Sequence, residues 1–264
     1  MKLSDIRLVC SDLDGTLLPN MGNGLSEEIF PLIRELKGRG VQFCPASGRQ
    51  FASLQKLFAP VAEDCLFMCD NGAVLFDRQG KLLAKTTMPR ALALEIARDF
   101  WDGCEGQGEV TLSGENTLYV LRRGLGGWEA LNAVGSRCVA ITAPEQVPEE
   151  IVKVSVYLPG GALPWSERFI PRWAAANATL AGPCWIDTTF ANKGTGVAGL
   201  CRELGIRPEQ VLAFGDNYND QPMLDTVGFP IIMETAHPPL RARYPRRTHR
   251  PEDTLRALLD GAEL

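Results

Sequence analysis

Two aspartates, two residues apart, follow a short apolar stretch near the start of the chain. Residues 8–10 (LVC) are typical of a buried strand in a parallel sheet, and Asp12, Asp14 and Gly15 come just after them. Open α/β sheets bind their ligands at the carboxyl ends of such strands. Two carboxylates held close together are unfavourable unless a cation, a shared proton or a substrate compensates for the repulsion. The pair indicates a divalent-metal or acid–base site, with a solvated Asp-x-Asp-Gly turn as the alternative.

A second acidic group follows another apolar stretch, far along the chain. Residues 211–214 (VLAF) have the pattern of a buried strand, and Asp216, Asn219 and Asp220 follow them. Mg²⁺ prefers oxygen ligands and uses only a few protein carboxylates, together with waters and phosphate oxygens. Two acidic strand ends are therefore the donor set that a magnesium site needs, although either loop alone could simply be polar.

Residue types that bind phosphate occur at two further places. Ser47 and Gly48 follow an expected strand over residues 41–45, and Lys193 precedes an expected helix over residues 194–204. A lone Ser-Gly is usually a turn, and a lone lysine is usually solvated. It is the occurrence of all four groups at strand ends or a helix start that indicates phosphoryl chemistry.

Strand and helix patterns alternate on both sides of the middle of the chain, which is the signature of a parallel sheet with right-handed crossovers. The middle instead mixes hairpins with helices, which predicts an α+β insertion. We therefore predict an α/β core from residues 1–83 and 190–264, with the inserted domain at residues 84–189. Outside the insertion, the expected strands are 8–10, 41–45, 66–69, 211–214 and 229–233, and the expected helices are 29–36, 51–58, 194–204, 221–227 and 254–259.

The composition excludes several classes of protein. The net charge of −5 argues against a nucleic-acid or anionic-membrane surface as the main binding partner. No apolar run reaches transmembrane length, and the N-terminus lacks the apolar segment of a signal peptide. The eight cysteines form no Cys-x-x-Cys motif, which favours a reducing, cytoplasmic location. His237 and His249 are the only histidines, which leaves little room for a histidine-based zinc site or a serine–histidine triad.

A run rich in arginine lies near the end of the chain, between residues 241 and 250. Pro245 lies among its arginines and Pro251 comes directly after them, and the run follows the last expected strand. We predict a solvated surface loop here rather than an anion-binding site.

Four short motifs resemble those of the haloacid dehalogenase superfamily, in its Cof-like branch of phosphatases. Residues 12–16 (DLDGT) match the first motif, and residues 47–49 (SGR) match the second, where threonine is commoner than serine. Residues 192–194 (NKG) match the third motif and residues 215–220 (GDNYND) the fourth. The resemblance covers the core on both sides of the insertion. It implies a Rossmann-like three-layer core around a parallel sheet, with the insertion as an α+β cap domain.

The resemblance also implies a mechanism and its residues. Asp12 would attack phosphorus to form an aspartyl-phosphate, and Asp14 would protonate the leaving alkoxide and then deprotonate the attacking water. Mg²⁺ would be held by the Asp12 carboxylate, the main-chain carbonyl of Asp14 and the Asp216 carboxylate, with Asp220 in support. The phosphate oxygens would be bound by Ser47, Gly48, Lys193 and Asn219.

The implied substrate is a small phosphorylated metabolite, with sugar phosphates as a candidate class, and the oligomeric state stays open. The cap would close over the site and recognise the leaving group of the substrate. Asn71 and Gly72 are further candidates for contact with the substrate. One alternative is a phosphotransferase or phosphomutase, in which an alcohol replaces water. Another is a non-catalytic metabolite-binding protein, but the presence of Asp12, Asp14 and Lys193 argues against it because a binder needs no nucleophile.

Overall fold

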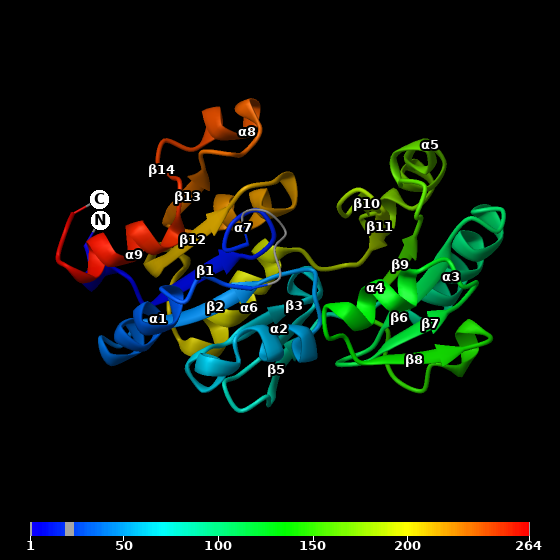
Figure 1. Cartoon of the computed structure of the whole chain (residues 1–264), viewed down its shortest axis with the longest axis horizontal. Helices are drawn as coiled ribbons and strands as arrows, with labels where there is room; N and C mark the ends of the chain where they lie inside the picture. Colours follow the sequence, from blue (N-terminus) through cyan, green and yellow to red (C-terminus); the bar gives the residue numbers. More distant parts are fainter. Residues whose placement is uncertain (1, 19–23, 264) are drawn as a thin grey trace. The chain divides into compact units, whose positions relative to one another are not determined.

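Strand β1 (Leu8–Asp12) lies at the centre of an eight-stranded sheet in the computed structural model, which describes residues 2–18 and 24–263 (Figure 1). All five residues of β1 are buried, as expected for a parallel strand covered on both faces. It pairs in parallel with β2 (Gln42–Ala46) on one side and β12 (Val211–Gly215) on the other, so that Cys10 stands opposite both Cys44 and Ala213. The sheet order is β14-β13-β12-β1-β2-β3-β4-β5.

Helices cover both faces of this sheet, which gives the three layers of a Rossmann-like core. Helices α6 (Lys193–Leu204) and α7 (Gln221–Thr226) pack on the face that carries Leu8 and Cys10. Helix α1 (Ile29–Gly38) packs beside α9 (Pro251–Leu259). The remaining strands are β2 (Gln42–Ala46), β3 (Phe67–Cys69), β4 (Val74–Phe76), β5 (Leu82–Lys85), β12 (Val211–Gly215), β13 (Phe229–Met233) and β14 (Arg247–Thr248). The helices are α1 (Ile29–Gly38), α2 (Phe51–Leu57), α6 (Lys193–Leu204), α7 (Gln221–Thr226), α8 (Pro238–Arg243) and α9 (Pro251–Leu259). The predicted α/β class with a parallel sheet is confirmed.

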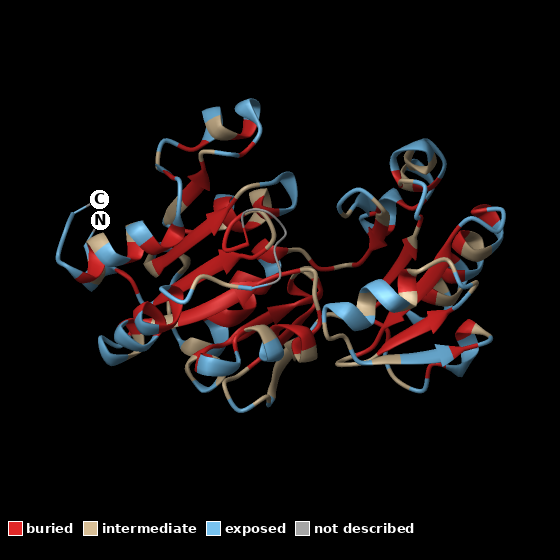
Figure 2. Ribbon diagram, viewed as in Figure 1, coloured by how far each residue is buried: buried red, intermediate tan, exposed pale blue. Residues whose placement is uncertain are grey.

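The chain divides into two compact units. Unit 1 consists of three segments: the residues up to Ser47, Leu54–Ala84, and the residues from Asn192 onward. Unit 2 comprises Gly48–Ser53 and Lys85–Ala191. In each unit the buried residues line the strands (Figure 2). Each unit therefore has a hydrophobic core of its own.

Unit 2 is an α+β structure built on a six-stranded, mostly antiparallel sheet. Its order is β10-β11-β9-β6-β7-β8, and of the neighbouring strands in this order only β7 and β8 run parallel. Phe100 and Phe169, from two helices, meet edge to face with ring centroids 4.9 Å apart, over a core that includes Val154. The strands are β6 (Glu109–Ser113), β7 (Leu118–Leu121), β8 (Cys138–Ile141), β9 (Lys153–Tyr157), β10 (Thr179–Leu180) and β11 (Trp185–Thr188), and the helices are α3 (Arg90–Gly103), α4 (Gly127–Ala133) and α5 (Leu163–Arg172).

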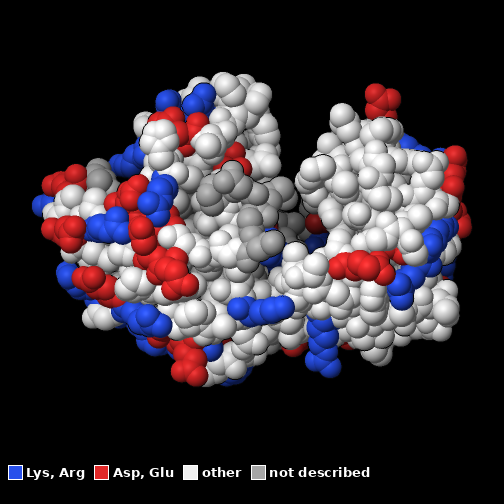
Figure 3. Space-filling view, in the orientation of Figure 1, with Lys and Arg blue, Asp and Glu red and all other residues white. Residues whose placement is uncertain are grey.

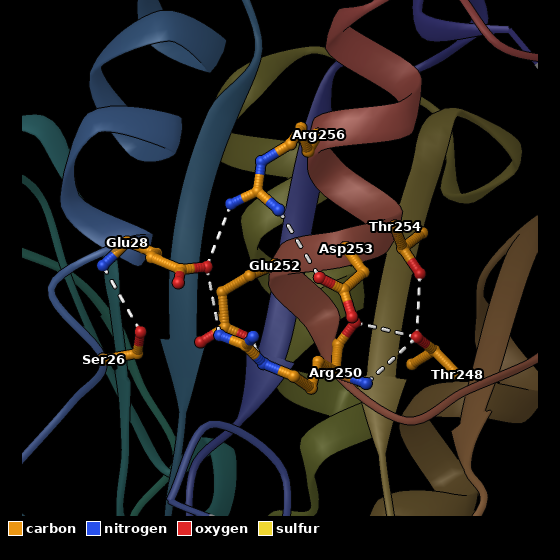
Figure 4. A network of polar contacts seen from close by, with 8 residues as sticks. All are labelled: Ser26, Glu28, Thr248, Arg250, Glu252, Asp253, Thr254 and Arg256. Atoms are coloured by element: carbon orange, nitrogen blue, oxygen red, sulfur yellow. Dashed lines mark hydrogen bonds and ion pairs between the residues drawn. The ribbon is translucent and has the colours of Figure 1, made fainter.

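The prediction of a loop for the arginine-rich run near the end of the chain was wrong, although Arg243, Arg247 and Arg250 are exposed. The run includes the end of α8 and all of β14, and several of its arginines pair with acidic residues. Arg243 donates to Asp225 at 2.8 Å. Arg250 reaches the Glu28 carboxylate at 3.1 Å, and Arg256, which follows the run in α9, reaches it at 2.9 Å (Figure 4). On the face shown in Figure 3, the Lys and Arg side chains of unit 1 lie interspersed with Asp and Glu.

Two features bear on the environment of the chain. All eight cysteines are free thiols. Within the described ranges, no helix combines the length and the apolar character that a membrane crossing requires.

Replacing Phe100 by alanine should destabilise unit 2. Phe100 is fully buried, and loss of its ring leaves a cavity against Phe169, so we expect the free energy of unfolding to fall by about 3–5 kcal/mol. Urea unfolding followed by fluorescence measures this change. Val139→Ala in the same unit serves as the control, because Val139 is 42% exposed and its truncation should change stability by less than about 0.5 kcal/mol. Equal effects of the two substitutions would contradict the assigned core.

Candidate active site

Asp12 is the last residue of β1, and a tight loop follows it. The N–H of Leu18 donates to the carbonyl of Leu13 at 2.7 Å, and the N–H of Gly15 donates to the carbonyl of Leu18 at 3.0 Å. Gly15 has a φ of +101°, and a Cβ atom at this position would lie 2.2 Å from Oδ2 of Asp216. Glycine is therefore required here both for the left-handed backbone and for close approach to the Asp216 carboxylate.

Asp220 holds the loop that follows β12. Its Oδ2 accepts the N–H groups of Asp216 at 3.0 Å and of Asn217 at 3.1 Å. Because these bonds close the loop onto the end of the strand, the Asp216 carboxylate is fixed beside Gly15. Asp220 thus acts first as a structural clamp for its neighbours.

Lys193 is the first residue of α6, and its helix start is capped. The N–H of Thr195 donates to Oδ1 of Asn192 at 2.9 Å, and the N–H of Asn192 donates to Oγ1 of Thr195 at 3.0 Å. This reciprocal capping box fixes the first turn of the helix. The ammonium of Lys193 is buried and donates to Oδ1 of both Asp12 and Asp220.

Three carboxylates meet at this place and have the donor chemistry of a divalent-cation site. Asp12, Asp216 and Asp220 each offer an oxygen within 4.8 Å of the others. Oδ2 of Asp12 and Oδ1 of Asp216 are buried and have no hydrogen-bond partner within the described chain. Both oxygens of Asp220, by contrast, already accept hydrogen bonds. The donor set therefore fits a hard cation held by Asp12 and Asp216, with Asp220 behind them.

The protonation of this cluster reflects burial and mutual repulsion. Burial, followed by the charge of Asp220, raises the pKa of Asp12 to about 8, although Lys193 opposes the shift. The same two causes raise the pKa of Asp216 to about 6. Burial alone would lower the pKa of Lys193, but the carboxylates of Asp12 and Asp220 raise it above its usual value. A bound cation would relieve this repulsion and favour the ionised carboxylates.

The structure brings together some of the residues that the sequence predicted. Direct hydrogen bonds join Lys193 to Asp12 and Asp220, and Asp216 lies against Gly15. The other predicted residues have these places: Asp14 is half-buried in the loop after β1, Ser47 is buried at the end of β2, Asn219 is exposed in the loop after β12, and Gly48 is half-buried in the segment that groups with unit 2.

Sequence reasoning missed Thr195, which fixes the start of the lysine-bearing helix. The signal for it was available: an asparagine followed three residues later by a side chain that can return a hydrogen bond is the pattern of a capping box. The contact of Gly15 with Asp216 joins positions far apart in the sequence and left no local signal.

The chain is similar to curated phosphatases over most of its length. It is 26% identical over 257 residues to an HMP-PP phosphatase of Serratia proteamaculans, covering 91% of this chain and 88% of the relative. It is 24% identical over 246 residues to a 5-amino-6-(5-phospho-D-ribitylamino)uracil phosphatase of Escherichia coli, covering 88% of this chain and 86% of the relative.

Solved structures share the fold of the whole chain. A protein from Eubacterium rectale superimposes with a TM-score of 0.81 at 24% identity, covering 97% of this chain and 99% of that one. A sugar phosphatase of haloacid dehalogenase subclass IIB superimposes with a TM-score of 0.77 at 17% identity, covering 94% of this chain and 95% of that one. The family model of haloacid dehalogenase-like hydrolases matches residues 9–158 and 169–253, which is most of the sequence. The chain therefore belongs to the family of haloacid dehalogenase-like hydrolases.

Proposed function

We propose that this protein is a Mg²⁺-dependent phosphatase that hydrolyses small phosphorylated metabolites, with sugar phosphates as a candidate class. The observation that carries the proposal is the Asp12 carboxylate. Lys193 donates to one of its oxygens, while the other is buried without a hydrogen-bond partner within the described chain. The family and the names of the relatives support a phosphate ester of a small molecule as substrate.

Asp12 acts as the nucleophile in the first step. The hydrogen bond from Lys193 to Oδ1 orients the carboxylate, so that one of its oxygens attacks phosphorus while the other stays available to a cation. The bond from this carboxylate oxygen to phosphorus forms as the ester P–O bond breaks, which yields an aspartyl-phosphate and an alkoxide. Asp14, two residues along the chain, gives its proton to the alkoxide.

Asp14 then acts as the base in the second step. It takes a proton from a water molecule, whose oxygen attacks phosphorus and displaces the Asp12 carboxylate. Inorganic phosphate leaves, and both aspartates return to their starting states. Ser47, Gly48, Lys193 and Asn219 bind the non-bridging oxygens, where stabilisation is mainly electrostatic.

A divalent cation fits the cluster, and Mg²⁺ is the ion we propose because the donors are all oxygens. The Asp12 and Asp216 carboxylates and the main-chain carbonyl of Asp14 would hold it, and Asp220 would support them. When bound, it supplies the positive charge that allows an anionic nucleophile to approach an anionic phosphoryl group.

The resemblance to the family also supports two wider assignments. We propose that the inserted domain, residues 84–189, determines which leaving group is accepted. We further propose a cytoplasmic location, which the eight free thiols support.

Phosphate release from a panel of monoesters, with Mg²⁺ and with a chelator, tests the activity. We expect release with Mg²⁺ and none with the chelator.

Asp12→Asn should lower turnover by at least about a thousandfold, because an amide oxygen is a poor nucleophile, while the thermal midpoint stays within a few degrees. Asp253→Asn, an exposed site on α9, is the matched control and should retain full activity. Turnover of Asp12→Asn within a fewfold of wild type would remove Asp12 from the nucleophile role.

Asp216→Asn should abolish the stabilisation of the folded protein by Mg²⁺. The substitution removes one of three mutually repelling carboxylates, so the chelator-treated variant should melt a few degrees above chelator-treated wild type. It also removes a cation donor, so added Mg²⁺ should raise the thermal midpoint of the wild type but not that of the variant. Thermal unfolding with titrated Mg²⁺ measures both effects. A variant that Mg²⁺ stabilises as strongly as wild type would place the cation elsewhere.

The chelator-treated protein should lose stability as the pH rises from 5 to 8. The folded state keeps a proton on Asp12 up to a pKa of about 8, whereas the unfolded chain releases it near pH 4. The stability that this proton contributes is complete below pH 4 and is lost as the pH rises through 8. Thermal midpoints across this range measure the slope, and Asp12→Asn should reduce it, leaving the part that Asp216 contributes through its own raised pKa. A slope that is unchanged in the variant would assign the effect to another group.

A further inference from the structure

The first turn of α6, which carries Lys193, lies between two segments of main chain. A Cβ atom at Gly194 would lie 2.4 Å from the carbonyl oxygen of Pro222, at the start of α7. A Cβ atom at Gly196 would lie 2.9 Å from Cα of Gly72 and 2.8 Å from Sδ of Met68. Residues two apart in an α-helix point about 200° apart, so the two contacts are on opposite sides of the helix. The turn is held from both sides at distances that only glycine permits.

The segment on the Gly196 side is a buried turn with an unusual backbone. Asp70, Asn71 and Gly72 have φ values of +48°, +58° and +95°. Residues other than glycine seldom adopt the left-handed region, although Asn and Asp do so more readily than most, and such conformations collect at functional sites, where the surrounding structure enforces them. Three in succession, directly after β3, mark this turn as a segment held in place by its contacts.

The same turn contacts both predicted phosphate-binding segments. The N–H of Asn71 donates to the carbonyl of Ser47 at 2.9 Å, and the N–H of Ser47 donates to the carbonyl of Met68 at 3.0 Å. A Cβ atom at Gly72 would lie 2.4 Å from the carbonyl oxygen of Asn192, the N-cap of α6. Gly72, which the sequence suggested as a substrate contact, therefore packs against the start of the helix.

We propose that Gly72 and Gly196 are positioning residues, whose main-chain contact fixes Lys193 relative to Ser47 for phosphoryl transfer. The proposal rests on the proposed function, since it assigns both residues to phosphate binding. Side chains do not separate the turn from the helix at this contact, so a shift of one is passed to the other. Because Gly194 blocks the opposite side, α6 cannot move toward α7 to absorb such a shift.

The size of the disturbance follows from the contact. Ordinary van der Waals contact begins at 3.4 Å, so a Cβ placed 2.9 Å from Cα of Gly72 requires a displacement of about half an ångström. Lys193 is buried and donates to two carboxylates, so a displacement of its helix start changes the geometry of both hydrogen bonds. Misplacements of this order in a phosphoryl-transfer site lower turnover by about ten- to a hundredfold.

Gly196→Ala tests the proposal, with Gly199→Ala as the matched control one turn along the same helix. A Cβ at Gly199 would meet only the flexible end of Leu75 within 3.4 Å, and alanine improves the helix propensity at both sites. We expect Gly196→Ala to lower kcat about ten- to a hundredfold with KM changed less than about threefold. Gly199→Ala should remain within twofold of wild type, and both thermal midpoints should stay within a few degrees. Wild-type kcat in Gly196→Ala would overturn the proposal.

A double-mutant cycle with Lys193→Met separates positioning from general damage. Inorganic phosphate with Mg²⁺, measured by calorimetry, is the probe. If Gly196 acts through Lys193, the effect of Lys193→Met on phosphate affinity should be at least threefold smaller in the Gly196→Ala background than in wild type. If the two substitutions together weaken phosphate binding by the product of their separate factors, the proposal is overturned.

A crystal structure of Gly196→Ala separates this proposal from the proposed function. A wild-type protein that neither hydrolyses the monoesters nor binds phosphate would reject the phosphatase assignment. The positional claim is then judged by the structure alone. Lys193 should have lost its hydrogen bond to Asp12 or Asp220, and a variant that keeps both bonds, with the helix in place, would overturn the claim.

Discussion

The organisation of the site depends on one buried ammonium group. Lys193 donates to Asp12, the last residue of β1, and to Asp220, in the turn that follows β12. Without that positive charge, the buried Asp12 and Asp220 and the half-buried Asp216 would face one another with nothing to offset their repulsion. The capping box sets the start of the lysine helix, Asp220 closes the loop beside it, and the glycine contacts fix where the helix lies. Each of these local features serves to place one nitrogen atom.

The parallel core could be predicted because its strands are apolar on both faces and end in polar residues. Other elements could not be predicted, for identifiable reasons. β8 is apolar throughout, but it is an edge strand with two exposed residues, and no alternation of polar and apolar residues distinguishes it in the sequence. The arginine-rich run was predicted to be a loop because of its prolines, but α8, which ends in this run, itself begins with Pro238 and Pro239. In the first turn of a helix, however, proline removes an N–H that has no partner, and it therefore favours a helix start.

The site, like the fold, could be predicted from the sequence only in part. The types and places of Asp12 and Asp216 follow from the sequence, because the ends of neighbouring parallel strands meet at one edge of the sheet. The contacts between them depend on tertiary distances. Nothing local indicates that Gly15 must approach the Asp216 carboxylate, or that Gly72 lies against the N-cap of α6. Close packing of main chain needs the absence of a side chain, and a glycine in the sequence does not reveal what it approaches.

The pairing of β1 with β12 has a consequence for biosynthesis. The first strand of the sheet leaves the ribosome early, but its partner on one side is made only after all of unit 2. Unit 2 is nearly continuous in sequence and can fold while translation proceeds, whereas the N-terminal strand must wait with one edge uncovered. The acidic residues therefore assemble last, and a nascent chain is incapable of catalysis until the C-terminal quarter has emerged.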